Sequence, residues 1–241
     1  MSYRNSGRKP DELRDVSLST GVNPYAEGSC QISWGHTKVL CTASVQANVP
    51  RWLKGQGKGW LTAEYGMLPR ATGERVDREA VKGKQGGRTV EIQRLIGRSL
   101  RSVCDLAVLD GFTLYIDCDV LVADGGTRVA SITGAYVAAA LAVQDMMAKG
   151  QIARNPFVSE VAAVSCGLSE QGAILDMDYG EDSTTIADGN FVMDGRGNWI
   201  ELQMTAEQRP LGHIERDTMM VLAEKGISEL IALQRAALAA V

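Results

Sequence analysis

The stretch that decides the fold is Phe112-Thr-Leu-Tyr-Ile-Asp-Cys-Asp-Val-Leu-Val-Ala-Asp-Gly-Gly-Thr-Arg-Val-Ala-Ser-Ile-Thr133. From Phe112 to Val120 apolar and polar residues alternate with a period of two, which predicts a strand with one buried face. The chain is then expected to turn at Asp124-Gly-Gly. From Val129 to Met147 it is rich in Ala, Val, Leu and Met and lacks Pro, which predicts a largely buried helix.

Thr127 and Arg128 stand where this helix is expected to begin. Glycine lets the backbone approach a ligand closely, and the free N–H groups of a helix N-terminus favour an anion. Arg128 adds a planar guanidinium fork. The loop therefore suits phosphate. Because Asp124-Gly-Gly is also an ordinary turn between a strand and a helix, this loop alone leaves both interpretations open.

A second loop of the same kind is Lys82-Gly-Lys-Gln-Gly-Gly-Arg88. The residues after it, from Thr89 to Cys104, place apolar side chains on one helical face and arginines on the other, which predicts an amphipathic helix. Two glycine loops that each bring an arginine to a helix start favour a shared anion site. The nucleotide fingerprints G-x-x-x-x-G-K-[ST] and strand-linked G-x-G-x-x-G are missing, which argues against a P-loop or Rossmann enzyme.

The charge of the chain is unevenly distributed. The net charge is −4, yet residues 51–101 carry 12 Lys and Arg against 5 Asp and Glu. Residues 50–88 are also rich in glycine and show no clear periodicity, and long irregular stretches in compact chains are more often functional than idle. We expect a localised surface for a polyanion, with ordinary solvated charge as the alternative.

Composition argues against several other classes of protein. With 241 residues, 45% of them hydrophobic and 22% charged, the chain is expected to be a globular protein. Its most apolar run, Val129–Val143, falls short of a membrane span, and no signal peptide is recognisable, so we expect a cytoplasmic location and no membrane partner. Five cysteines without a C-x-x-C pair are expected to be reduced core residues. His36 and His213 are too few for a zinc site or a catalytic triad.

The remaining chain predicts further hairpins and a closing helix. Hairpins are expected at residues 25–34 with 37–45, 161–168 with 173–179, and 190–193 with 199–204, and a helix at 214–238. We therefore predict an α/β (α+β) fold of duplicated hairpin-plus-helix units. The expected organisation is a single domain, residues 1–241, made of two pseudo-repeats at about 1–154 and 155–241.

An acidic segment, Glu181-Asp-Ser-Thr-Thr-Ile-Ala-Asp188, lies between the last two hairpins. Its carboxylates, with Asp176 and Asp178 just before them, would repel one another unless a cation or solvent separates them. Asp182 and Asp188 are able to share a Mg²⁺ ion only if the chain turns between them. A solvated acidic loop is the alternative.

Eight ordered segments of the chain resemble the ribonuclease PH family of bacterial phosphate-dependent 3′ exoribonucleases. They are Ser6-Gly-Arg8, Ala26-Glu-Gly-Ser29, Thr37-Lys-Val-Leu-Cys-Thr42, Leu53-Lys-Gly-Gln-Gly57, Leu61-Thr-Ala-Glu-Tyr-Gly-Met-Leu-Pro-Arg70, Gly83-Lys-Gln-Gly-Gly-Arg88, Ala123-Asp-Gly-Gly-Thr-Arg128 and Glu181-Asp-Ser183. The resemblance implies a duplicated α/β unit with mixed sheets, assembled as a hexameric ring that is a trimer of dimers.

The resemblance also implies an activity and the residues that carry it. Family members trim the 3′ ends of tRNA precursors and other RNA, use inorganic phosphate as co-substrate and release nucleoside diphosphates. The implied phosphate-binding residues are Arg88, Gly126, Thr127 and Arg128. The implied catalytic carboxylates, which would hold Mg²⁺, are Asp182 and Asp188. The implied RNA-binding residues are Arg70, Arg75 and Arg78.

Three segments depart from the family pattern. Ile186-Ala-Asp188 stands where the family has Glu-Thr-Asp, so an acidic neighbour of Asp188 is missing. Met204-Thr-Ala-Glu-Gln208 stands where the family has Gly-Thr-Ala-Glu-Gly, and His36 replaces an acidic residue in the first hairpin turn. These departures leave open the alternative that the protein is a catalytically weak ring subunit that binds RNA. A third alternative is a small-molecule phosphate-transfer enzyme, whose affinity for RNA would barely respond to salt.

Overall fold

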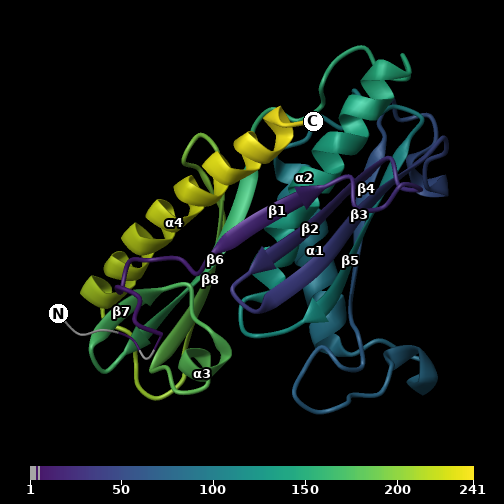
Figure 1. The fold of residues 1–241 in the computed structure, drawn as a ribbon. Coiled ribbons are helices and arrows are strands. Elements are labelled where there is room, and N and C mark those ends of the chain that lie inside the picture. Colours follow the sequence, from purple (N-terminus) through teal and green to yellow (C-terminus); the bar gives the residue numbers. More distant parts are fainter. Residues whose placement is uncertain (1–3, 5) are drawn as a thin grey trace.

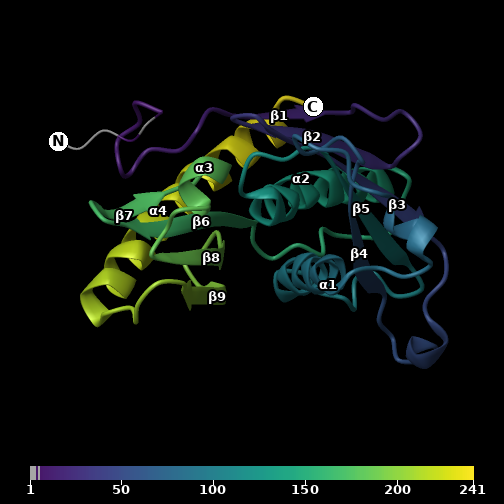
Figure 2. The same cartoon turned by 90° about the horizontal axis from the view of Figure 1, so that it is seen from below.

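The computed structural model describes residue 4 and residues 6–241. Two β-sheets lie side by side, each with helices packed on it, and the N-terminal segment runs from one sheet to the other (Figure 1). The longest apolar helix, α2, lies between the first sheet and strand β6 of the second (Figure 2). The predicted α/β (α+β) fold is confirmed.

The first sheet has five strands in the order β1-β2-β3-β5-β4. It is mixed, because β4 and β5 run parallel and the other neighbours run antiparallel. Its strands and associated helices are β1 (Val16–Thr20), β2 (Gly28–Trp34), β3 (Thr37–Gln46), the 3₁₀ turn η1 (Arg51–Leu53), β4 (Trp60–Met67), the 3₁₀ turn η2 (Glu79–Lys82), α1 (Gly87–Ser102), β5 (Thr113–Val122) and α2 (Thr127–Ala148).

The second sheet has four strands in the order β7-β6-β8-β9 and is antiparallel throughout. Its elements are β6 (Val161–Ser169), β7 (Gly172–Leu175), the short helix α3 (Tyr179–Asp182), β8 (Ala187–Asp194), β9 (Trp199–Ala206) and α4 (His213–Ala239). Helix α4 packs across β6 and β7.

Burial explains why β5 and α2 form the centre of the fold. In β5 the alternate residues Leu114, Ile116, Cys118 and Val120 are buried, as the period of two predicts. Helix α2 is the one described helix that is long and apolar enough to cross a membrane, but 89% of the apolar window lies inside the protein. It is therefore a core helix, and its small residues allow the close packing of a sheet on either side.

The described cysteines and histidines lie where the sequence predicts. All five cysteines are free, and Cys104 alone is not fully buried. His36 lies in the exposed turn between β2 and β3, and His213 lies at the exposed start of α4. The predicted hairpins and long helices form within a few residues of their expected bounds.

Three elements differ from the sequence expectations. Residues 50–88 are not wholly irregular, because β4 forms within them and buries Leu61, Ala63 and Tyr65 on one face. Strand β1 was not expected. Tyr179, predicted to end a strand, instead begins α3, because Asp178 and Glu181 form a capping box that starts a helix there.

Candidate active site

A pocket of about 100 Å³ lies where α1, α2 and the second sheet meet. All six residues predicted to bind phosphate or act as catalytic carboxylates line it: Arg88, Gly126, Thr127, Arg128, Asp182 and Asp188. The alternative that Asp124-Gly-Gly is a turn without further role does not account for this convergence. The individual roles of the six residues stay predictions.

Two helix N-termini open onto this pocket. Arg88 lies in the first turn of α1 and Arg128 in the first turn of α2. Both helices have a glycine at the N-cap position, Gly86 and Gly126, so neither N-cap residue has a side chain to cap the N–H groups that follow it, although the Gly86 N–H itself donates to Glu79 Oε1 at 3.0 Å. Because uncapped N–H groups and the helix dipole favour negative charge, both ends contribute to an anion site.

Neighbouring side chains hold the second of these N-termini in place. The Arg128 guanidinium donates to Glu91 Oε1 and to Gln203 Oε1, each at 3.1 Å. The Thr127 hydroxyl lies 2.9 Å from the hydroxyl of Tyr65, which is buried. Burial raises the pKa of Tyr65, and its contact with Thr127 and the charges of the two pocket arginines oppose that rise. The phenol therefore stays protonated at neutral pH and is available to orient Thr127.

The chain turns between the two pocket carboxylates, as a shared cation requires. Asp182 ends α3, the Thr184 N–H donates to Glu181 O at 3.2 Å, and β8 begins at Ala187. Asp188 follows on β8 and pairs in register with Thr205 of β9. The acidic segment is therefore not an extended solvated loop.

The pocket raises the pKa of both carboxyl groups. Burial is the main cause at Asp182, where Arg88 and Arg128 oppose it. Burial is again the main cause at Asp188, followed by the charges of Asp182 and Glu207. Because burial and like charge both disfavour ionisation, a cation between these groups would relieve the cost.

This shift predicts how the carboxyl groups titrate. In a carboxyl-carbon NMR titration without divalent cations, Asp182 and Asp188 are expected to titrate above the ordinary value of 3.8. Glu207→Gln removes a charge that raises both, so both pKa values are expected to fall. Glu201→Gln, also on the β9 side, serves as the control and is expected to leave them unchanged. A Glu207→Gln protein with unaltered titrations would contradict this account. Cation binding is expected to weaken as the pH falls through the raised pKa values.

The phosphate loop, defined as residues 124–128 and predicted to bind phosphate, touches the segment that leads to Asp182. Gly125 has φ +76°, and a Cβ built there would lie 2.7 Å from Met177 O, 2.8 Å from Asp178 C and 2.9 Å from Tyr179 N. Only glycine fits both the left-handed backbone and this contact. The absent side chain at Gly125 therefore sets how closely the two halves of the pocket approach.

Gly125→Ala is expected to destabilise the protein more than backbone strain alone does. Gly55 is a matched control, because it also has φ +76° and a Cβ there meets nothing within 4 Å. Gly55→Ala is expected to cost about 1–2 kcal/mol of unfolding free energy, and Gly125→Ala a further ~1–3 kcal/mol from overpacking. Urea denaturation measures both. Equal losses at the two positions would show that the contact does not matter.

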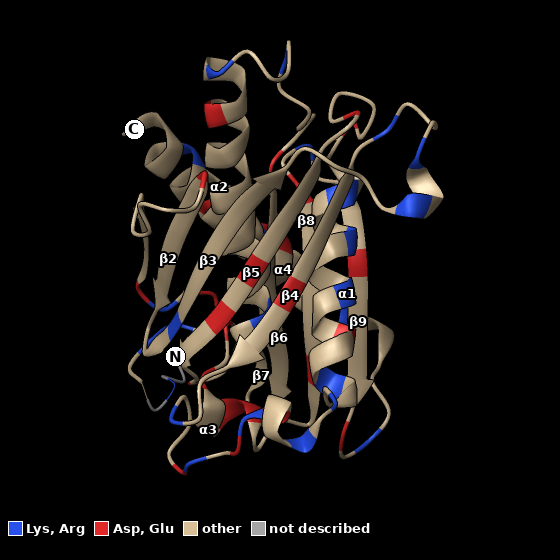
Figure 3. Ribbon diagram, turned by 90° about the vertical axis from the view of Figure 1, so that its right-hand side faces the viewer, with Lys and Arg blue, Asp and Glu red and all other residues tan. Residues whose placement is uncertain are grey.

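The three predicted RNA-binding arginines lie outside this pocket. The Arg70 guanidinium donates to Gly73 O at 3.0 Å, and Arg75 forms an exposed ion pair with Asp77 at 2.8 Å. Arg78 lines a larger cavity of about 690 Å³ that also contains Lys84 and shares Arg88 with the pocket. Ribbon positions occupied by Lys and Arg gather along α1 and in the segment before it (Figure 3).

Several residues at the pocket were not predicted from the sequence. Met177, Ser165, Gly189 and Asn190 also line it. Asn190 follows Asp188 by two residues on a strand, so the alternation of β8 was a signal that would have found it. Tyr65 lies within a segment quoted for the family resemblance, and Glu207, whose charge acts on both carboxylates, lies within the segment 204–208 that departs from the family pattern. No local pattern points from either residue to the pocket.

Comparisons with known proteins identify the family. The 3′ exoribonuclease family, domain 1, matches residues 12–144, and domain 2 of the same family matches residues 159–229. Ribonuclease PH of Caulobacter vibrioides is 57% identical over 235 residues, covering 98% of this chain and 99% of that protein. The chain belongs to the 3′ exoribonuclease family of ribonuclease PH. Ribonuclease PH of Rhodospirillum rubrum is 54% identical over 236 residues, with 98% of each chain covered.

Solved structures with the ribonuclease PH fold match at lower identity. Rice Rrp46 superposes with a TM-score of 0.78 at 21% identity, covering 98% of this chain and all of that one. A chain of the Archaeoglobus fulgidus exosome with RNA bound to the active site superposes with a TM-score of 0.77 at 20% identity, covering 95% of this chain and 91% of that one. These likenesses support the fold. The family predicted from the sequence motifs is confirmed, and with it the predicted 3′ exoribonuclease class.

Proposed function

We propose that this ribonuclease PH family member removes nucleotides from the 3′ ends of tRNA precursors and other RNA by phosphorolysis. Inorganic phosphate is the co-substrate and nucleoside diphosphates are the products. The observation that carries the proposal is the pocket itself, in which two helix N-termini with glycine N-caps bring Arg88 and Arg128 beside Asp182 and Asp188.

The pocket residues account for the chemistry. Arg88, Arg128 and the helix N–H groups hold phosphate in line with the last phosphodiester and offset its charge against that of the RNA. A phosphate oxygen bonds to the phosphorus while the 3′ oxygen of the preceding nucleotide leaves. Phosphate already carries oxyanions at neutral pH, so the nucleophile needs no general base. His36 and His213 do not line the pocket and have no role in this scheme.

Asp182 and Asp188 suit Mg²⁺ as a donor set. Magnesium is commonly held by one or two carboxylates and completes its coordination with water and substrate phosphates. Among residue 4 and residues 6–241, no group of three or more His, Cys, Asp or Glu is arranged to hold a metal without such help. When bound there, Mg²⁺ supplies positive charge to the phosphoryl oxygens and to the leaving 3′ oxygen.

A release assay tests the proposal. RNA with a single-stranded 3′ end, incubated with the protein, Mg²⁺ and phosphate, is expected to yield nucleoside diphosphates in amounts that rise with phosphate concentration. Monophosphate products, or equal release without phosphate, would refute it. RNA binding without any release would instead favour a catalytically weak ring subunit. Ile186, which motivates that alternative, is buried and does not line the pocket.

The basic segment is proposed to bind the RNA backbone. Arg70, Arg75 and Arg78 would follow a single strand by charge rather than by base. Arg78→Gln is expected to reduce the slope of log affinity against log salt by about 0.7, the value for one phosphate contact on a single strand. Arg196→Gln, in the turn between β8 and β9, is the control for a lost surface charge. If both variants show the same slope as the unaltered protein, Arg78 does not contact the backbone.

We also propose a hexameric ring built as a trimer of dimers, in the cytoplasm. The structural neighbours include a chain of an archaeal exosome core, and a ring would present several 3′ exoribonuclease pockets to one RNA. Light scattering is expected to give six times the 25.9 kDa mass of one chain.

A further inference from the structure

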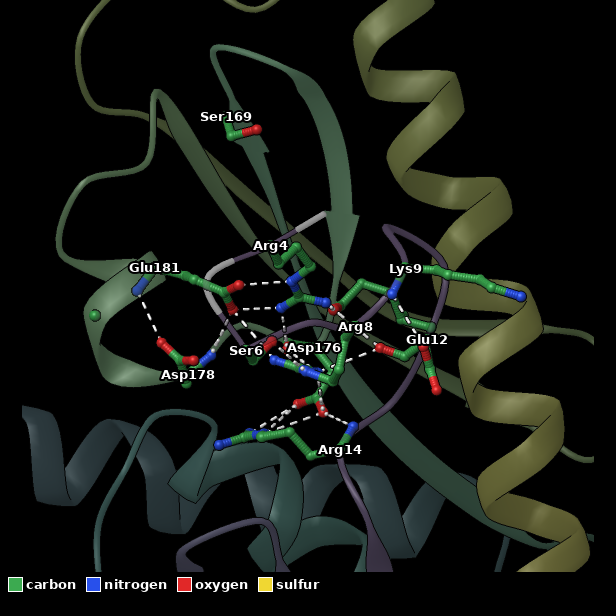
Figure 4. A network of polar contacts seen from close by, with 12 residues as sticks. Arg4, Ser6, Arg8, Lys9, Glu12, Arg14, Ser169, Asp176, Asp178 and Glu181 are labelled. Atoms are coloured by element: carbon green, nitrogen blue, oxygen red, sulfur yellow. Dashed lines mark hydrogen bonds and ion pairs between the residues drawn. The ribbon is translucent and has the colours of Figure 1, made fainter. Parts of the chain in front are cut away.

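A buried carboxylate, Asp176, lies at the centre of a polar network that joins arginines of the N-terminal segment to Glu181 (Figure 4). Its side chain has no exposed surface. It accepts hydrogen bonds from the Arg14 backbone N–H at 2.7 Å, from Arg14 Nη2 at 2.7 Å and from Trp34 Nε1 at 2.8 Å. Asp176 also has φ 54°, the one positive φ of a described residue other than glycine. Such strain persists where the surroundings fix the residue firmly.

Arg14 connects this carboxylate to the phosphate loop. Its Nη1 donates to Asp124 O at 2.5 Å, directly before Gly125 and Gly126. A Cβ built at Gly126 would lie 3.2 Å from Arg14 Nη2, so the guanidinium packs against the N-cap of α2. The Thr37 hydroxyl also holds this loop, because it donates to Gly125 O at 2.7 Å.

Arg4 connects the same network to the other half of the pocket. Its Nε donates to Glu181 Oε1 at 2.6 Å, and its Nη2 bonds the second carboxylate oxygen of Glu181. Its Nη1 donates to Leu175 O at 2.6 Å and its Nη2 to Asp176 O at 2.8 Å. Glu181 in turn caps α3, whose last residue is Asp182. The guanidinium therefore holds both the start of α3 and the strained turn at Asp176.

We propose that Arg14, Asp176 and Arg4 form a positioning network for the phosphorolytic reaction, which fixes the phosphate loop relative to Asp182. This inference rests on the proposed function. None of the three residues lines the pocket, so each acts through the loop that it holds. A buried ion network stabilises poorly compared with apolar packing of the same volume. Stability alone does not explain why three charged groups are buried here, whereas in-line attack requires placement to within about 1 Å.

Arg14, which contacts the phosphate loop, and Arg4, which contacts Glu181, are expected to affect different kinetic constants. Arg14→Lys keeps the charge beside Asp176 and loses the planar fork that reaches Asp124 O. It is expected to raise the KM for phosphate by about 10-fold or more while kcat changes less. Arg4→Lys loses its two-point contact with Glu181. It is expected to lower kcat by about 10-fold or more, and to raise the Mg²⁺ concentration needed for half-maximal rate, with little change in phosphate KM.

Arg235→Lys is the matched control, because Arg235 makes the same kind of two-point contact with Glu160, at 2.6 and 3.0 Å, and does not line the pocket.

The test combines steady-state kinetics with calorimetric binding of inorganic phosphate to each variant, and thermal melts show that each variant is folded. The split between phosphate KM and kcat, absent in Arg235→Lys, would support the network. Folded Arg14→Lys and Arg4→Lys proteins with constants within about 2-fold of the unaltered protein would overturn it, as would parallel losses that follow only the melting temperature. Phosphate binding is measured without RNA, so it tests the network even if the unaltered protein released no diphosphates, a result that would instead refute the proposed function.

Discussion

Asp188→Asn is expected to lower kcat by about 10²–10³-fold with only a small change in the KM for phosphate. The substitution keeps the size of the side chain and removes the negative charge that would hold a cation beside the reacting phosphates. Asp188 lies on β8, within a regular strand, so the neutral amide is expected to leave the backbone unchanged. Quenched-flow or steady-state release at saturating phosphate measures the effect.

Asp110→Asn is the control for loss of a carboxylate on an exposed turn before β5. It is expected to show the kcat of the unaltered protein. A normal turnover rate in Asp188→Asn would remove this residue from the catalytic group, whereas loss in both variants would point to a general effect of charge.

Arg128→Ala is expected to raise the KM for phosphate by about 10–100-fold, the range that corresponds to one lost hydrogen bond to a charged group. The guanidinium contributes charge at the N-terminus of α2, while Glu91 and Gln203 keep it in place. Turnover at saturating phosphate is expected to fall less than binding, because Arg88 and the helix N–H groups still orient the bound anion. Calorimetric titration with inorganic phosphate, without RNA, gives the binding change directly.

Arg94→Ala, on the exposed side of α1, is the control for loss of a cation from the same basic region. It is expected to leave phosphate binding unchanged and to weaken RNA binding only slightly. Unaltered phosphate affinity in Arg128→Ala would contradict the assignment of the α2 N-terminus as half of the anion site.

Local pattern predicted most of the secondary structure. The alternation before Asp124 specifies a strand with one buried face, the Ala-rich run after Thr127 specifies a largely buried helix, and both elements form as expected. The parallel pairing of β4 with β5 could not be predicted in the same way, because β4 lies inside a glycine-rich basic segment and its pairing is a long-range contact. The division of residues 1–241 into two pseudo-repeats stays a prediction.

The residues that line the site could be predicted from the sequence, but the ion pairs that hold their loops in place could not. The two arginine-bearing glycine loops and the two aspartates carry chemical signals that can be read one at a time. The repulsion expected among the acidic residues near Asp176 is relieved for Asp176 and Glu181 by arginines from the N-terminal segment, more than 150 residues away in the chain, as the sequence separations of these contacts show. No pattern within either segment indicates that pairing, since it depends on how the two sheets lie together.

The central claim is that inorganic phosphate is the nucleophile in this pocket, and the fate of radiolabelled phosphate tests it most directly. With unlabelled RNA and labelled inorganic phosphate, the account predicts that the label appears in the terminal phosphate of the released nucleoside diphosphates, one label for each nucleotide removed. Nucleotides released while all the label remains in inorganic phosphate would contradict it.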